Sequence, residues 1–110
     1  MKIKLKNSVV NVEIADSFFK QMVGLSFSGK KNMLFVMPYE RRWRMWMFGV
    51  KFPLKIIFIN KKKVVVDIKE ANPITLNPKT WKVYAPKKSC KYILETPYKL
   101  KVKIEDKFRW

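Results

Sequence analysis

Arginines and large aromatic residues are interleaved between positions 41 and 48, and this segment is the part of the chain best suited to binding an anion. Its sequence is RRWRMWMF, and it holds all but one of the arginines. Alternate side chains of a strand share a face, so Arg42, Arg44, Trp46 and Phe48 are predicted to lie together. On such a face arginines can hold phosphates while aromatic rings stack on bases. The spacing predicts a surface for single-stranded nucleic acid or another polyanion.

Two lysine runs could enlarge that surface. Lys61, Lys62 and Lys63 lie at the tip of an expected hairpin, and Lys87 and Lys88 form a second run. The competing interpretation is that the lysines are solvated turns and that the aromatic residues pack in the core. The full set of predicted anion-binding residues is Arg41, Arg42, Arg44, Trp46, Phe48, Lys61, Lys62 and Lys63.

Carboxylates offer the other candidate chemistry. The chain has 8 acidic residues, among them Glu13, Asp67, Glu70 and Glu95. Two carboxyl groups roughly 5 to 10 Å apart across a cleft can hydrolyse a glycosidic bond. Glu95 follows an apolar stretch, so we expect it either to take part in such a reaction or to be the buried ion-pair partner of a lysine. A carboxylate-dependent glycan hydrolase is therefore the alternative function.

Histidine is absent and Cys90 is the one cysteine, which excludes several classes of site. Histidine-dependent triads, histidine metal sites, intramolecular disulfides and cysteine zinc clusters cannot be built. The chain also has no glycine-rich phosphate loop and no nucleophile elbow. We therefore expect no metal and no cofactor, and a non-catalytic binding or accessory module is favoured over an enzyme. Cys90 is expected to be a small apolar filler rather than a reactive thiol.

The charge of the chain admits a third hypothesis. The net charge is +17, from 25 basic and 8 acidic residues, and it predicts attraction to polyanions. However, most of the basic residues are lysines spread through almost every segment. A dispersed lysine excess is equally well explained by the composition of the host's proteome. The protein would then be a structural module whose charge has no partner.

The sequence also predicts where the protein resides. The opening stretch MKIKLKNSVV alternates charged and apolar residues, whereas a signal peptide needs an unbroken apolar core. The longest apolar stretch, 45–59, is interrupted by Lys51, Pro53 and Lys55 and falls short of the roughly 18 residues of a spanning helix. We expect a cytoplasmic protein with no transmembrane segment.

Short strands are the elements expected to position these residues. Alternation of apolar and polar residues predicts an N-terminal hairpin of strands 1–6 and 9–14, followed by a helix from about 16 to 23 that ends at Gly24. Ile74 and Leu76 are expected to enter the core, and Phe108 and Trp110 to cover one end of it. The remaining strands are predicted at 33–37, 42–48, 54–59, 64–68, 81–84, 91–96 and 100–104.

These elements indicate a single β-rich domain over residues 1–110. A chain of 110 residues can bury one core without disulfides or metals. Many short strands with one early helix indicate a mainly β fold, either a small closed or partly open β-barrel or a two-layer sandwich.

Four sequence blocks carry a family resemblance over nearly the whole chain. The most specific is Trp46-Met47, followed after five residues by Pro53-Leu54 and by the apolar run that includes Phe58. The others are Ala15 with Val23-Gly24-Leu25, the run 33–36, and Tyr92-Ile93-Leu94-Glu95. The chain thereby resembles the domain of unknown function 192 family, small β-rich proteins of archaea and bacteria. The resemblance implies the β-rich fold and no mechanism, because the family has no established activity. The family-motif positions are Gly24, Leu25, Trp46, Met47, Pro53, Leu54, Phe58 and Glu95.

The chain departs from the family pattern at polar positions. Residues 48–50 are Phe-Gly-Val where the family usually has Lys-Asn-Thr, and Lys55 replaces an aspartate. Asn32 and Glu105 stand where the family usually has glycine. The resemblance therefore implies that a site built from the family's polar cluster is lost or altered in this chain.

Overall fold

In the computed structural model, residues 1–15, 31–46, 52–73, 77–80 and 82–110 are described, and they form three sheets and one short 3-10 helix. The strands join as a five-stranded sheet of order β3-β4-β9-β6-β7, a three-stranded sheet of order β10-β1-β2, and a two-stranded ribbon β5-β8. Their bounds are β1 Lys2–Leu5, β2 Ser8–Asn11, β3 Glu13–Ala15, β4 Met33–Arg41, β5 Met45–Trp46, β6 Leu54–Ile59, β7 Val65–Ala71, η1 Pro78–Thr80, β8 Val83–Tyr84, β9 Cys90–Thr96 and β10 Phe108–Arg109.

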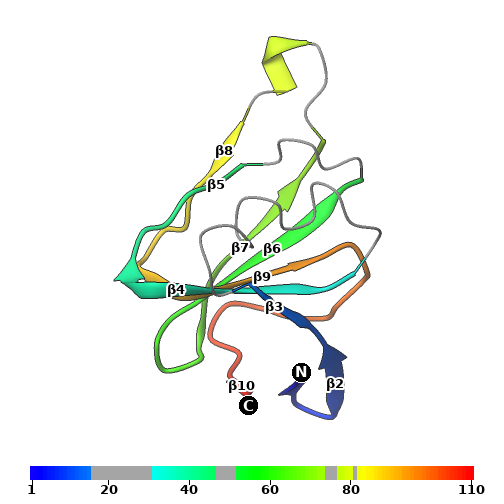
Figure 1. Ribbon diagram of the computed structural model, residues 1–110, viewed down its shortest axis with the longest axis vertical. Helices are drawn as coiled ribbons and strands as arrows, with labels where there is room; N and C mark the ends of the chain where they lie inside the picture. Colours follow the sequence, from blue (N-terminus) through cyan, green and yellow to red (C-terminus); the bar gives the residue numbers. More distant parts are fainter. Residues whose placement is uncertain (16–30, 47–51, 74–76, 81) are drawn as a thin grey trace.

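The three-stranded sheet packs on one face of the five-stranded sheet, while the β5-β8 ribbon and η1 project from the other side (Figure 1). The mainly β prediction is confirmed, and the architecture is that of a two-layer β sandwich. Within the described residues β3 and β7 are the edges of the larger sheet, which does not close into a barrel.

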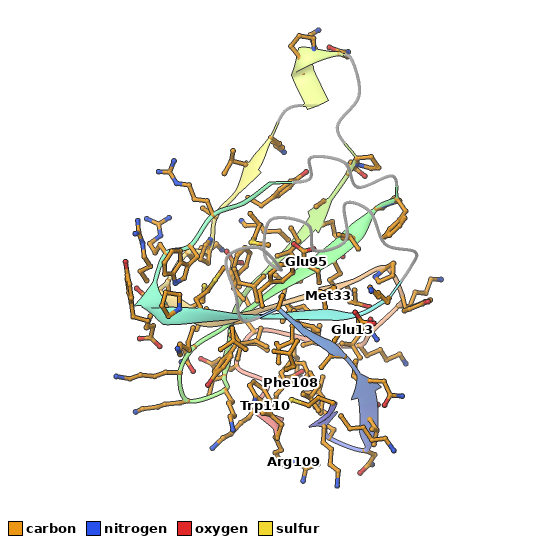
Figure 2. The ribbon with its side chains drawn as sticks, viewed as in Figure 1. Glu13, Met33, Glu95, Phe108, Arg109 and Trp110 are labelled. Carbon is orange, nitrogen blue, oxygen red and sulfur yellow. The ribbon has the colours of Figure 1, made fainter. Side chains whose placement is uncertain are left out.

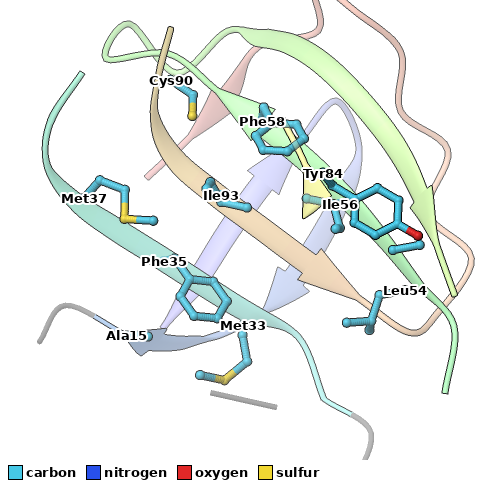
Figure 3. Packing of buried hydrophobic residues seen from close by; sticks show 11 residues of the cluster. Ala15, Met33, Phe35, Met37, Leu54, Ile56, Phe58, Tyr84, Cys90 and Ile93 are labelled. Atoms are coloured by element: carbon cyan, nitrogen blue, oxygen red, sulfur yellow. The ribbon is translucent and has the colours of Figure 1, made fainter. Parts of the chain in front are cut away.

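The two faces of the five-stranded sheet carry separate apolar clusters because neighbouring strand residues point to opposite sides. One cluster lies between the two sheets and includes Ile57 and Leu94 with Ile3 from β1 and Phe108 from β10. The other lies on the opposite face. Figure 3 shows its packing, which includes Ala15, Met33, Phe35, Met37, Leu54, Ile56, Phe58, Tyr84, Cys90 and Ile93. Apolar side chains are thus buried on both faces of β6, as its unbroken apolar run predicts.

The N-terminal hairpin is confirmed, but its second strand divides between the two sheets. Met1 and Val12 exchange backbone hydrogen bonds of 3.0 and 2.8 Å, which closes the pairing of β1 with β2. Beyond Val12 the chain forms β3, which runs parallel to β4. One extended segment therefore joins the two layers, an arrangement that local alternation of residues cannot reveal.

The predicted strand 33–37 continues as β4 to Arg41, past Pro38. Between the pairs Val36–Tyr92 and Arg41–Cys90, β4 advances five residues while β9 advances two. The extra residues form a bulge, and a bulge accommodates a proline because the extra residue is not paired in the ladder. The prediction that Pro38 ends the strand was wrong for this reason.

The predicted last strand, 100–104, is also wrong. That segment has no strand structure. The last strand of the chain is β10, which pairs with β1 on the side opposite β2. Glu105 has a φ of 79° in a turn after which the chain enters β10, and Val65 exchanges hydrogen bonds with the backbone of Glu105 and Asp106. The apolar residues at 100, 102 and 104 suggested a strand, but Ile104 is 47% exposed while Phe108 is fully buried.

Several predictions fall outside the described residues. They concern the helix 16–23 with Gly24 and Leu25, the core positions Ile74 and Leu76, and the face assigned to Met47 and Phe48. In the described part of the predicted strand 42–48, Met45–Trp46 is a strand and pairs with Val83–Tyr84. Residues 42–44 are not strand, because β4 ends at Arg41, so the prediction that Arg42 and Arg44 share a strand face was wrong. No helix in the described ranges is both long and apolar enough to cross a bilayer.

Candidate anion-binding surface

The β4 bulge places an aromatic pair at the surface. Tyr39 is 56% exposed, and its ring lies 5.2 Å from that of Trp43. The Trp43 indole Nε1 donates a 2.8 Å hydrogen bond to the Tyr39 carbonyl, and the Arg41 guanidinium stacks 4.8 Å from the indole ring. Tyr39 was missed as a candidate because the strand was expected to end at Pro38. Its alternation with Arg41 and Trp43 is the signal that could have identified it.

Two further arginines lie beside this pair. The Arg42 side chain is fixed by a 2.8 Å hydrogen bond from Nε to the Pro86 carbonyl, and none of the described residues bonds its terminal nitrogens. Arg44 is exposed. The contact with Pro86 also brings the exposed Lys87 and Lys88 next to the end of β4. The lysine pair and the arginine cluster, more than forty residues apart in sequence, therefore share one end of the molecule.

The β6–β7 hairpin tip reaches the same end. The Lys61 backbone N–H donates a 2.7 Å hydrogen bond to the Glu40 carboxylate on β4. Lys61 and Lys62 are exposed. Lys63 is turned away, because its Nζ donates to the Trp110 carbonyl at 2.7 Å and lies 4.6 Å from that indole ring. Of the three lysines predicted at the hairpin tip, Lys63 therefore contacts Trp110 and does not join Lys61 and Lys62.

We call this end of the protein the basic end surface. Nitrogen-tipped side chains project there around the far end of β4 and the β6–β7 hairpin (Figure 2). Both acids near it are already bonded: Glu40 accepts from Lys61, and the buried Asp67 accepts from the backbone of Lys87 at 3.0 Å. The surface comprises Tyr39, Arg41, Arg42, Trp43, Arg44, Lys61, Lys62, Lys87 and Lys88. The side chains of Trp46 and Phe48 lie outside the described part of the chain.

Glu95 is buried in the core. It pairs with Met33 on β4 and with Ile56 on β6, and it lies on the same sheet face as these two residues (Figure 2). Its residue is 4% exposed, and the described residues give its carboxylate no ion pair and no hydrogen bond. Burial raises the pKa of Glu95 to about 8, because desolvation disfavours the charged form. The expected lysine partner is not found among the described residues.

The other acids serve local structure. Asp67 accepts from the backbone of Ile68 at 2.9 Å as well as from Lys87, and Lys69 lies 3.5 Å away. Glu13 bonds Lys31 at 2.7 Å, and the exposed Glu70 lies 3.8 Å from Lys55.

A glycosidase needs two carboxyl groups on an open cleft. Two hollows lie near the end of β9 and are lined entirely by described residues; Glu70 is the single carboxylate that lines one of them, and Glu95, Asp67 and Glu13 line neither. The hydrolase hypothesis therefore gains no support from the described geometry. The described residues also hold no group of three or more potential metal ligands.

Cys90 is fully buried at the start of β9. The pKa of its thiol is raised to about 11, mainly because burial disfavours the charged thiolate. A hydrogen bond with the Trp43 backbone acts to lower this pKa, and the nearby Glu40 carboxylate acts to raise it. The thiol is neutral at physiological pH and packs as an apolar side chain, as expected for a filler.

The family resemblance is confirmed by comparison of sequences. The model of domain of unknown function 192, described as "Uncharacterized ACR, COG1430", matches residues 1–110. A UPF0127 protein of Pyrococcus abyssi is 37% identical over 107 residues, which cover 90% of this chain and 85% of the relative. A UPF0127 protein of Thermococcus sibiricus is 35% identical over 117 residues, covering 99% of this chain and 71% of the relative.

Solved structures share the fold. A protein of unknown function from Novosphingobium aromaticivorans superimposes with a TM-score of 0.81 at 23% identity, covering 99% of this chain and 84% of that one. A candidate transcription regulator from Sinorhizobium meliloti has the same TM-score at 21% identity, covering 98% of this chain and 91% of its own. At this level of identity the likeness establishes the fold alone. Of the family-motif positions, Leu54, Phe58 and Glu95 are buried, and Pro53 is exposed at the start of β6.

Proposed function

Because the chain belongs to the uncharacterised domain of unknown function 192 family, whose relatives supply no activity, we propose from its own surface that it binds single-stranded nucleic acid. The observation that carries the proposal is the convergence of three basic segments on the exposed Tyr39 ring and the partly buried Trp43 ring beside it. No catalytic step is part of this function.

The chemistry of the surface fits a single strand better than a duplex. Arginine and lysine side chains attract phosphates without reading sequence, and exposed aromatic rings stack on bases that are not already paired. Arg41 stacked on Trp43 holds its charge beside the rings, so phosphate and base contacts can be made together. The Glu40 and Asp67 carboxylates accept hydrogen bonds from the backbones of Lys61 and Lys87, so each acid is held against one of the basic segments.

Replacing both Arg42 and Arg44 by alanine is expected to weaken binding of a fluorescein-labelled oligothymidylate by about tenfold at low salt. Each phosphate contact on a single strand contributes about 0.7 to the slope of log affinity against log salt, so the slope should fall by about 1.4. Fluorescence anisotropy at several salt concentrations measures both quantities.

The matched control removes the same charge elsewhere. Lys99 and Lys101 are exposed on the segment after β9, at the opposite end of the sheet. Lys99→Ala/Lys101→Ala should change the affinity by less than about twofold. Equal weakening by the two double variants would show that net charge alone attracts the oligonucleotide, and no binding by the unmodified protein at low salt would refute the function.

Tyr39→Ala is expected to weaken oligonucleotide binding by about fivefold or more, because stacking on an aromatic side chain contributes about 1 to 3 kcal/mol per base. Tyr39→Phe keeps the ring and should bind within about twofold of the unmodified protein. Both variants retain the Tyr39 carbonyl that accepts from Trp43, so the local backbone is not altered. The same anisotropy titration gives the result, and a loss of affinity in both variants would assign the effect to the hydroxyl instead of the ring.

A further inference from the structure

The free edge of β2 faces a hollow at the end of the sandwich opposite the basic end surface. The hollow has a volume of about 370 Å³. β2 lines one side along its whole length, and Thr96, Tyr98 and Lys99 line the other. Among the described strands β2 pairs with β1 alone, so this side of β2 is the edge of its sheet.

The hydrogen-bond pattern shows which backbone groups face the hollow. Met1 and Val12 exchange both of their backbone hydrogen bonds. Bonded and non-bonded pairs alternate along an antiparallel ladder, so the pairs Lys4–Val9 and Lys2–Asn11 are non-bonded. The N–H and C=O groups of Val9 and Asn11 therefore point away from β1, toward the free edge.

A side chain confirms the direction of these backbone groups. The Asn32 Nδ2 donates a 3.0 Å hydrogen bond to the Asn11 carbonyl, which can occur only if that carbonyl points outward. The residue Asn32 lines the same hollow, and its Oδ1 is buried and finds no hydrogen-bond partner among the described residues. No described residue bonds the N–H or C=O of Val9. The backbone N–H and C=O of Val9 thus face the hollow as one donor and one acceptor.

We propose that this hollow binds an extended acidic peptide, which pairs with the edge of β2 as an added strand. An extended backbone presents an N–H and a C=O at the spacing that Val9 requires. The charged side chain of the lining is Lys99, and the exposed Lys2 and Lys4 lie on the neighbouring strand. This charge favours glutamate or aspartate, while the exposed Val9 and Tyr98 offer apolar contact.

The charge also argues against a second copy of this chain as the occupant. Pairing of two β2 edges would bring together two proteins of net charge +17, with the Lys2 and Lys4 of each β1 one strand back from the seam. An acidic peptide relieves that repulsion. The site shares no residue with the basic end surface, so the two binding functions are independent.

The test is calorimetric titration with a blocked heptapeptide of alternating valine and glutamate, and with its lysine counterpart. Val9→Pro deletes the outward N–H and no bond to β1, so it should weaken binding of the glutamate peptide by about fivefold or more. Val9→Ala keeps the N–H and should bind within about twofold. Lys99→Glu should weaken the glutamate peptide and strengthen the lysine peptide.

Thermal melting confirms that Val9→Pro is folded; if it is not, Lys99→Glu decides the question, because Lys99 is exposed on a loop. No binding of the glutamate peptide, or equal binding to the Lys99→Glu variant, overturns the proposal. A dimer that Val9→Pro dissociates would identify a second copy as the occupant and would also overturn it. Arg42→Ala/Arg44→Ala should leave peptide binding unchanged, which separates this site from oligonucleotide binding.

Discussion

Glu95→Gln is expected to stabilise the protein by about 3 to 5 kcal/mol at pH 9 and to change its stability little at pH 4. The folded protein keeps the Glu95 carboxyl protonated up to its pKa of about 8, whereas the unfolded chain releases that proton near 4.5. Between about pH 4.5 and 8 the unfolded chain releases this proton and the native protein does not, so rising pH lowers the free energy of the unfolded state relative to the native state and the protein loses stability over that window. Glutamine has a similar shape and no proton to lose.

Urea unfolding of the unmodified protein and of Glu95→Gln, at several pH values between 4 and 9, measures how the difference in their free energies of unfolding depends on pH. Glu70→Gln is the control, because Glu70 is exposed and its distant pair with Lys55 contributes little. The difference between Glu95→Gln and the unmodified protein should grow with pH, while that for Glu70→Gln should stay within about 0.5 kcal/mol. A variant that is less stable at every pH would mean that the Glu95 carboxylate is ionised and paired in the native protein.

Phe108→Ala is expected to destabilise the protein by about 3 to 5 kcal/mol, the usual cost of removing a buried phenylalanine. Phe108 is fully buried between the two sheets, and its backbone N–H donates a 2.9 Å hydrogen bond to the Lys63 carbonyl. It also anchors β10 against Leu5 of β1. The side chain therefore holds the smaller sheet to the β6–β7 hairpin.

Ile104→Ala provides the matched comparison. Ile104 lies four residues earlier, in the segment that the sequence pattern predicted as the last strand, yet it is 47% exposed. Its replacement should change the free energy of unfolding by no more than about 0.5 kcal/mol. Denaturant unfolding of both variants decides the matter: equal losses would place Ile104 in the core and contradict the assignment of β10.

Local pattern was sufficient for elements whose partners are near in sequence. The apolar run of β6, the lysine-rich tip and the return strand were predicted because a continuous apolar stretch and a polar turn specify a hairpin. Burial of Glu95 was one of the two alternatives that the apolar residues before it suggested, but the lysine partner expected with it is not found among the described residues. The same logic failed where the structure depends on distant partners: β3 pairs in parallel with β4, and β10 owes its position to β1 and β7.

The basic end surface was predicted in part for the same physical reason. Arg42 and Arg44 were identified from their spacing, and the lysine tip from its composition. Their meeting depends on the Arg42–Pro86 and Lys61–Glu40 hydrogen bonds, which join segments that no local pattern connects. Lys63 was expected beside its neighbours, but the tertiary contact with Trp110 redirects it.

The most direct test of the proposed function is the amide chemical-shift map of the ¹⁵N-labelled protein titrated with oligothymidylate. We predict that the largest shift changes fall on residues 39–44, 61–62 and 87–88, with none on 8–11 or 96–100. Small changes spread evenly over lysines in all segments would contradict the account, because they would mean that the charge attracts polyanions without a specific surface.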